Sequence, residues 1–94
     1  MPKVRKSLFD VHYVEIVDGL IQRRKLIGLS QWDMAVRLGE DQSWVSRIER
    51  KQRRLDAFEY VRFCRVLDLE PGTIMNPIWD KLPRSEDRKP SEDA

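Results

Sequence analysis

The sequence predicts a compact all-α domain of five short helices. Apolar residues recur at helical spacing in several segments, and residues that favour helix ends stand between them. A chain of 94 residues, of which 40% are hydrophobic, is long enough for one domain with a small core. We expect this domain to span residues 7–79, between a basic arm at residues 1–6 and a polar, disordered tail at residues 80–94.

The first helix should begin near Ser7 or Asp10 and run to Ile27, because Gly28 provides a stop. Its buried side should carry Tyr13, Ile16, Val17, Leu20 and Ile27. Gly19 lies inside this helix and costs about 1 kcal/mol relative to alanine, which weakens the helix locally without ending it.

The second helix should begin at Ser30, an N-cap residue with Asp33 three positions later as its polar partner. Its apolar positions are Met34, Ala35 and Leu38. Gly39 ends it, because glycine reaches the left-handed conformation at little cost. A third helix follows at once, and two short helices that meet at a glycine are typical of a helix-turn-helix motif that reads DNA.

The third helix should start after Asp41 and bury only a narrow stripe. Val45 and Ile48 are its core positions, which leaves most of the circumference exposed. Its opposite face carries Gln42, Ser43, Ser46, Arg47 and Arg50. A helix with so much exposed polar surface is presenting that surface to a partner.

The fourth helix should begin after Asp56, with Glu59 at the capping-box position. Its buried positions are expected to be Ala57, Tyr60, Val61, Cys64 and Leu67. A short fifth helix should open at Glu70 and Pro71, because proline suits the first position of a helix.

Positive charge is concentrated beside the helix pair. The whole chain has a net charge of +2, which is too small to indicate nucleic acid by itself. Between Gln42 and Arg54, however, five basic residues stand against Glu49 alone. In a helix-turn-helix protein this is the region that would meet phosphate.

Several other classes of protein are disfavoured. One cysteine cannot form an internal disulfide, and one cysteine with one histidine cannot assemble a metal site, so we expect no cofactor and no metal. No nucleophile with a neighbouring base and no glycine-rich phosphate loop is visible, so we expect no enzyme. The sequence has no apolar run of membrane-spanning length and no signal segment, which predicts a cytoplasmic protein.

The segments SQWDMAVRLG and QSWVSRIER resemble the helix-turn-helix of the lambdoid phage repressors and Cro proteins, and of the bacterial regulators named after the xenobiotic response element (XRE). The resemblance extends from Leu20 to Met75. Residues at the positions that mark the family are Gln31, Ala35, Gly39, Gln42, Ser46, Ile48 and Glu49. Lys51 departs from the family, which usually has glycine there. Lys51 must therefore accept a positive φ at some strain, or the third helix must run on by part of a turn.

The resemblance implies a lambda-repressor-like fold, double-stranded DNA as the partner, and a set of site residues. The residues expected to contact base edges are Gln42, Ser43, Ser46 and Arg47. Those expected to contact phosphates are Ser30, Gln31, Arg50, Lys51, Arg53 and Arg54, although the basic members could simply form a charged loop. Glutamine can pair with adenine and arginine with guanine, which makes Gln42 and Arg47 the best specificity determinants. The family also has a structural ion pair at the positions of Arg24 and Glu49.

Two aromatic residues and the cysteine have simpler interpretations. Trp44 lies at the edge of the third helix between core and groove, where it either packs on the scaffold or lies against sugar and phosphate; we favour packing. Trp32 is expected to be a surface aromatic residue, and Cys64 a small buried apolar residue.

The function implied is a sequence-specific transcriptional regulator from a bacterium or phage, a repressor that acts as a homodimer on a palindromic operator. The alternative is an antitoxin, or a phage or restriction-modification control protein, that also binds a partner such as a toxin. The dimer would form through the segment after the helix-turn-helix, with candidate residues Phe58, Phe63, Val66, Ile74, Ile78 and Trp79. Alternatively, Ile78 and Trp79 fold back onto the core of their own chain.

Overall fold

The computed structural model describes residues 10–84, which form α-helices and no strand within that range. The helices are α1 (Val11–Leu26), α2 (Gln31–Leu38), α3 (Gln42–Glu49), α4 (Ala57–Leu67) and α5 (Gly72–Lys81). The predicted all-α fold is confirmed. The expected basic arm at residues 1–6 and residues 85–94 of the expected tail lie outside the described residues.

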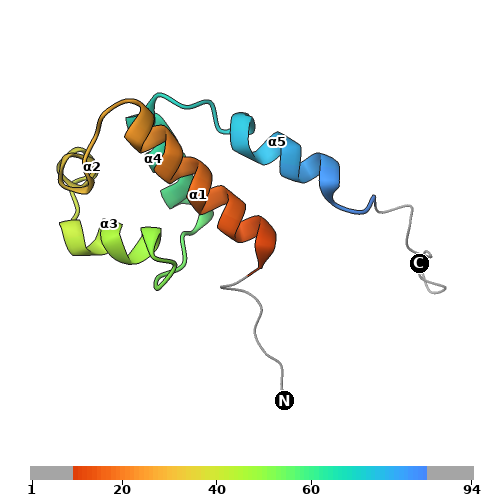
Figure 1. Cartoon of the computed structure of the whole chain (residues 1–94), viewed down its shortest axis with the longest axis horizontal. Helices are drawn as coiled ribbons and strands as arrows, with labels where there is room; N and C mark the ends of the chain where they lie inside the picture. The colour runs from red at the N-terminus through yellow and green to blue at the C-terminus, as the bar shows by residue number, and fades with distance from the viewer. Residues whose placement is uncertain (1–9, 85–94) are drawn as a thin grey trace, which may run out of the picture.

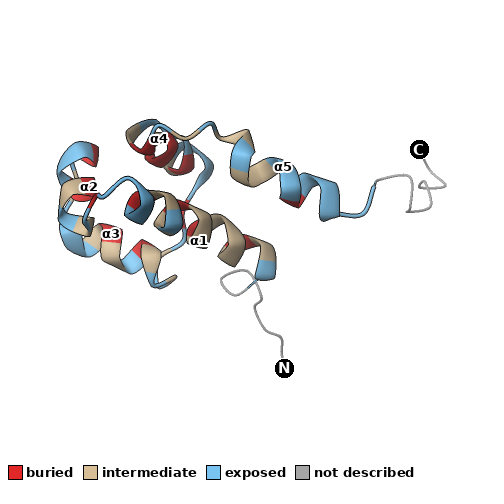
Figure 2. Ribbon diagram, turned by 45° about the horizontal axis from the view of Figure 1, so that its top comes forward, coloured by how far each residue is buried: buried red, intermediate tan, exposed pale blue. Residues whose placement is uncertain are grey.

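The arrangement of the helices places α2 and α3 at one end of the molecule. α1 crosses the middle beside α4, and α5 extends toward the other end (Figure 1). The buried residues of the first four helices face one another, whereas the outer surfaces of α2, α3 and α5 are largely exposed (Figure 2). The core therefore lies between α1 and the next three helices, and α5 is attached to it mainly through α1.

The ends of α1 follow from its flanking residues. The Asp10 carboxylate accepts hydrogen bonds from the backbone N–H groups of His12 and Tyr13, so the helix begins at the second of the two expected starts. Gly28 has φ +81°, as a stop in the left-handed region requires. The expected burial of Ile27 is wrong: Ile27 is the exposed C-cap residue, and Leu29 enters the core after the turn instead.

Local sequence signals also account for α2 and α3. Ser30 and Asp33 form a reciprocal capping box, in which the hydrogen bonds from Ser30 lower the pKa of the Asp33 carboxyl. Gly39 has φ +73° and turns the chain into α3. Val45 and Ile48 are fully buried, as predicted. Asp41 is the N-cap residue of α3, but its side chain makes no capping hydrogen bond.

The buried face of α4 differs from the prediction. Asp56 and Glu59 form the expected capping box. The buried stripe consists of Tyr60, Phe63, Cys64 and Leu67. Val61 is 51% exposed and Ala57 is also exposed, so both predictions were wrong. The large ring of Phe63 occupies the core because it stacks on Trp44 of α3, with the ring centroids 5.9 Å apart.

The C-terminal end of α4 is closed by a residue from α1. Arg23 donates from Nε to the backbone oxygen of Leu67 at 3.0 Å and from Nη2 to that of Asp68 at 2.9 Å. Asp68 has φ +52°, so the chain leaves α4 through a left-handed residue that is not glycine. These bonds satisfy carbonyl groups that a helix end leaves without partners.

α5 approaches α1 at Gly19, which explains a glycine inside a helix. A Cβ atom on Gly19 would lie 2.7 Å from the Cδ1 atom of Ile74 in α5. Pro71 is the N-cap residue of α5, and the helix continues past Trp79 to Lys81. The first two residues of the expected tail are therefore helical.

Candidate nucleic-acid interface

The exposed face of α3 brings the predicted base-contacting residues together on one helix. Gln42, Ser43 and Arg47 are exposed, and Ser46 is half-buried. On the other side of α3, Val45 and Ile48 anchor the helix in the core. One face of α3 is therefore packed in the core and the opposite face is exposed, which is the geometry required to enter a DNA groove.

A chain of hydrogen bonds connects the core to the first residue of this face. Arg24 donates to both carboxylate oxygens of Glu49, from Nε at 2.7 Å and from Nη2 at 2.9 Å. Gln31 donates from Nε2 to Glu49 Oε1 at 2.9 Å. Gln42 in turn donates from Nε2 to Gln31 Oε1, also at 2.9 Å. The side chain of Gln42 is therefore positioned by three residues from α1, α2 and α3.

Gln42 retains the groups that base recognition needs. Its amide nitrogen has two hydrogens, of which the bond to Gln31 uses one, and its Oε1 atom accepts no hydrogen bond within residues 10–84. One N–H donor and one acceptor of Gln42 then remain without a partner among residues 10–84. That pair matches the N7 acceptor and the N6 donor that adenine presents in the major groove.

The ion pair between Arg24 and Glu49 is largely buried. Their side chains are 10% and 8% exposed, and Arg24 Nη1 also donates to the backbone oxygen of Leu29 at 2.7 Å. Two parallel bonds between a guanidinium and a carboxylate fix geometry as well as adding energy. The pair expected from the family resemblance thus joins α1 to the end of α3.

The basic residues in the last turn of α3 and directly after it are of two kinds. Arg47 and Arg50 are exposed, and neither has an ion-pair partner among residues 10–84. Lys51, by contrast, donates from Nζ to Asp18 Oδ1 of α1 at 2.6 Å. Lys51 also has φ +63°, so the first of the two predicted alternatives for this residue is confirmed.

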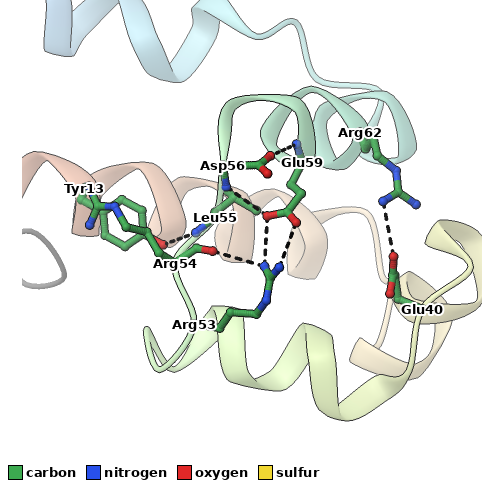
Figure 3. A network of polar contacts seen from close by, with 8 residues as sticks. All are labelled: Tyr13, Glu40, Arg53, Arg54, Leu55, Asp56, Glu59 and Arg62. Atoms are coloured by element: carbon green, nitrogen blue, oxygen red, sulfur yellow. Dashed lines mark hydrogen bonds and ion pairs between the residues drawn. The ribbon is translucent and has the colours of Figure 1, made fainter.

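Arg53 and Arg54 contact neighbouring side chains (Figure 3). Arg53 donates two hydrogen bonds to the carboxylate of Glu59, each 3.0 Å long, and these bonds lower the pKa of Glu59. The guanidinium of Arg54 lies over the ring of Tyr13, 4.2 Å from its centroid. The hydroxyl of Tyr13 accepts a hydrogen bond from the backbone N–H of Leu55 at 2.8 Å. Of the expected phosphate ligands, Lys51 and Arg53 thus already have carboxylate partners.

The partners that hold these residues are not predictable from the sequence. Asp18 and Tyr13 belong to α1 and lie more than thirty positions from Lys51 and Leu55. No local pattern links residues at such a separation. Glu59 was identified as a capping residue, and that signal did not indicate its second role as the partner of Arg53.

The expected dimer residues separate into buried and exposed sets. Phe63 and Ile78 are only 2% and 8% exposed and belong to the interior of the chain, so these two interface predictions were wrong. Val66 and Ile74 are half-buried and pack against the core. Phe58 is 71% exposed and Trp79 is 77% exposed. Ile78 is thus buried within its own chain, although it is not part of the main hydrophobic core, and Trp79 is exposed.

Other singled-out residues have structural roles. Trp44 packs on Phe63, as favoured, and Trp32 is exposed. Cys64 is buried, and burial raises the pKa of its thiol, as expected for an inert apolar position.

In the part of the chain that the structure describes, no helix is long and apolar enough to cross a membrane.

α2 and α3 meet at a left-handed glycine, and α3 is buried on one face and exposed on its polar face. These features identify the domain as a helix-turn-helix domain. The chain matches the family described as helix-turn-helix domain over residues 17–74. It is similar to the solved structure of an XRE-family like protein from Pseudomonas syringae pv. tomato str. DC3000, with a TM-score of 0.73 and 32% sequence identity over 82% of this chain and 94% of that chain. A comparison with curated proteins found no match. The chain belongs to the XRE-type helix-turn-helix family and is a DNA-binding regulator.

Proposed function

We propose that this regulator is a sequence-specific transcriptional repressor that acts as a homodimer on a palindromic operator. The observation that carries the proposal is the exposed face of α3, where Gln42 is held with a free donor and acceptor and Arg47 is exposed on the same helix. A polar face that is oriented by its own scaffold is suited to read bases rather than only to attract phosphate.

Each residue of the interface has a proposed role. Gln42 pairs with adenine and Arg47 with guanine in the major groove, while Ser43 and Ser46 make shorter contacts to neighbouring base edges. Arg50 and Arg54 contact phosphates on either side of the groove. The hydroxyl of Ser30 and the backbone N–H group of Gln31, at the start of α2, bind a further phosphate, where the helix dipole favours negative charge.

Two copies are proposed because one short recognition helix reaches few bases. A symmetric pair doubles the contacts and matches a palindrome whose half-sites are about 34 Å apart, one turn of the duplex. The exposed Trp79 on α5 and Phe58 on α4 supply apolar surface for such a contact. The bound dimer would cover a promoter and block transcription in the cytoplasm.

Selection of binding sites from a pool of random duplexes tests this function. The full-length protein should recover one inverted repeat, and footprinting should protect two half-sites on the same face of the duplex. Recovery of unrelated sequences, with the same affinity for the selected and the starting pool, would contradict sequence-specific binding.

A second candidate function is an antitoxin or control protein that binds a protein partner as well as DNA. It is supported by Trp32 and Val36, two exposed apolar residues four positions apart on the outer side of α2. Coexpression with the products of adjacent genes and copurification would test it. Loss of a copurifying partner upon Trp32→Ser, with operator binding unchanged, would support this alternative.

A further inference from the structure

Arg53 lies in the segment between α3 and α4 (Figure 3), and it contacts both helices. Its two terminal nitrogens donate to the two carboxylate oxygens of Glu59 in α4, and Nη1 also donates to the backbone oxygen of Arg54 at 3.2 Å. Its Cζ atom lies 5.1 Å from the centroid of the Trp44 ring in α3. One guanidinium group therefore joins α3, the connecting segment and α4.

The two partners of Arg53 are themselves fixed in place. Glu59 accepts a hydrogen bond from the backbone N–H of Asp56 at 3.0 Å, and the Asp56 carboxylate accepts one from the backbone N–H of Glu59 at 2.7 Å. Trp44 stacks on the buried ring of Phe63 in α4. Arg53 thus completes a connected cluster in which every other member already belongs to a helix or its cap.

We propose that Arg53 is a positioning residue, which locks the recognition helix α3 to the first turn of α4, and that it is not a phosphate ligand. The proposal rests on the proposed function, because it assumes that α3 reads DNA. α3 otherwise packs mainly on α2 and α1. The clamp made by Arg53, Trp44 and Glu59 is its polar connection to α4, and it sets where the connecting segment lies against the duplex.

The charge of Arg53 is already balanced within the protein. Two hydrogen bonds of 3.0 Å to a carboxylate that is only 14% exposed form a bidentate, charge-assisted pair. If a phosphate replaced Glu59 as the partner of Arg53, the Glu59 carboxylate would lie next to a second anion. The pair as a whole has no net charge, so it releases few counterions when DNA binds.

The clamp needs arginine rather than any cation. The planar guanidinium can donate two parallel bonds to Glu59 while it stacks on the Trp44 ring. A lysine ammonium is a point charge that cannot do both at once. A phosphate contact, by contrast, tolerates lysine well, so the two roles predict different results for Arg53→Lys.

The experiment measures affinity for the duplex that the full-length protein selects, at a series of salt concentrations. The variants are Arg53→Gln, Arg53→Lys, Glu59→Gln and the double variant of Arg53→Gln with Glu59→Gln. Arg50→Gln serves as the variant that loses a phosphate contact. Arg65→Gln is the matched control, because Arg65 is exposed on α4 and has no ion pair within residues 10–84.

If Arg53 is a positioning residue, Arg53→Gln, Arg53→Lys and Glu59→Gln should each weaken binding about tenfold, and the double variant should be no weaker than the single ones. The salt slope should stay at the wild-type value, whereas Arg50→Gln should flatten it by about 0.9 for each bound subunit, or about 1.8 for the dimer. The fluorescence of Trp44 is obtained by subtracting the spectrum of the same protein with Trp44→Phe. This fluorescence should change in all three single variants before DNA is added.

The opposite pattern would overturn the proposal. If Arg53 binds phosphate, Arg53→Gln should flatten the salt slope by about 0.9 for each bound subunit, or about 1.8 for the dimer. Arg53→Lys should bind normally, and Glu59→Gln should bind as tightly as the wild type or more tightly. Stoichiometric titration of each variant gives its active fraction, so a partly unfolded sample is not counted as a weak binder. If the wild-type protein itself shows no preference for the selected duplex, the proposed function fails, and that result is distinct from any difference between variants.

Discussion

At the scale of single residues, recognition by Gln42 depends on residues that do not reach the bases. Gln31 holds the amide of Gln42, Glu49 holds Gln31, and Arg24 holds Glu49. The first two links are single hydrogen bonds and the third is a two-bond ion pair, and together they fix a flexible side chain in one orientation before DNA binds. The entropy of ordering Gln42 is then lost in folding rather than in binding.

A double-mutant cycle on Gln31 and Gln42 should reveal this link. Gln31→Ala removes the acceptor of the Gln42 amide and should weaken binding to the selected duplex by about 1 kcal/mol or more. After Gln42→Ala, the same change should cost less, because its partner is already gone. Gln52→Ala, at an exposed glutamine in the connecting segment, is the control. Strictly additive losses would mean that Gln31 acts only on phosphate.

Acid stability should report the bond between Arg53 and Glu59. Arg53 lowers the pKa of Glu59 below the ordinary value of 4.5, so the unfolded chain takes up this proton more readily than the folded one. The stabilisation is therefore present above about pH 4.5 and is lost as the pH falls through the lowered pKa. Urea unfolding of Glu59→Gln should show a smaller loss of stability between pH 7 and pH 3 than the wild type. The exposed Asp80→Asn should behave like the wild type, and equal losses for Glu59→Gln would contradict this prediction.

At the scale of helices, the sequence was most informative where structure is decided locally. Capping boxes at Ser30 and Asp56 and the left-handed Gly39 each involve residues within four positions, and all three were identified correctly. The predicted burial of Val61 failed because helical periodicity accepts Val61 and Phe63 almost equally. The choice between them depends on Trp44, a partner from another helix.

The residues of the candidate site were also predictable only where a local motif marks them, and their contacts with distant residues were not. The family resemblance led to Gln42, Arg47 and the pair of Arg24 with Glu49, because those positions recur in one short motif. It did not separate the basic residues with carboxylate partners, Lys51 and Arg53, from the others. That separation depends on the path of the chain after α3, which no periodic pattern encodes.

The contact between α1 and α5 gives a test at this scale. Gly19→Ala places a Cβ atom against Ile74 and should destabilise the fold by about 1 to 3 kcal/mol through overpacking, less the gain of about 1 kcal/mol in helix propensity. Adding Ile74→Val removes the nearest atom and should restore stability. Thermal unfolding measures both. If Gly19→Ala alone raises the melting temperature, α5 does not press on α1 at this point.

At the scale of the whole molecule, α5 carries a large exposed aromatic residue directly after a buried apolar one. Ile78 anchors α5 to its own chain, while Trp79, the next residue, points to solvent. A large ring exposed beside a buried anchor is the feature that most favours a second copy.

Trp79→Ser should therefore shift the protein toward monomer and weaken its binding to the two-site duplex more than to a single half-site. Sedimentation velocity at micromolar concentration, with and without the duplex, measures this. Trp32→Ser removes an equally large exposed ring from α2 and should leave the assembly intact. A wild-type protein that stays monomeric in both conditions would contradict the proposed homodimer.

Affinity for every single-base-pair variant of the selected duplex tests most directly that the exposed face of α3 reads sequence. We predict that Gln42→Ala and Arg47→Ala each lose about 1 to 3 kcal/mol on the preferred duplex and lose discrimination at one position of each half-site. Arg65→Ala should keep the wild-type profile. If Gln42→Ala and Arg47→Ala instead weaken binding to all duplexes equally, with the base preferences unchanged, the face of α3 does not read bases.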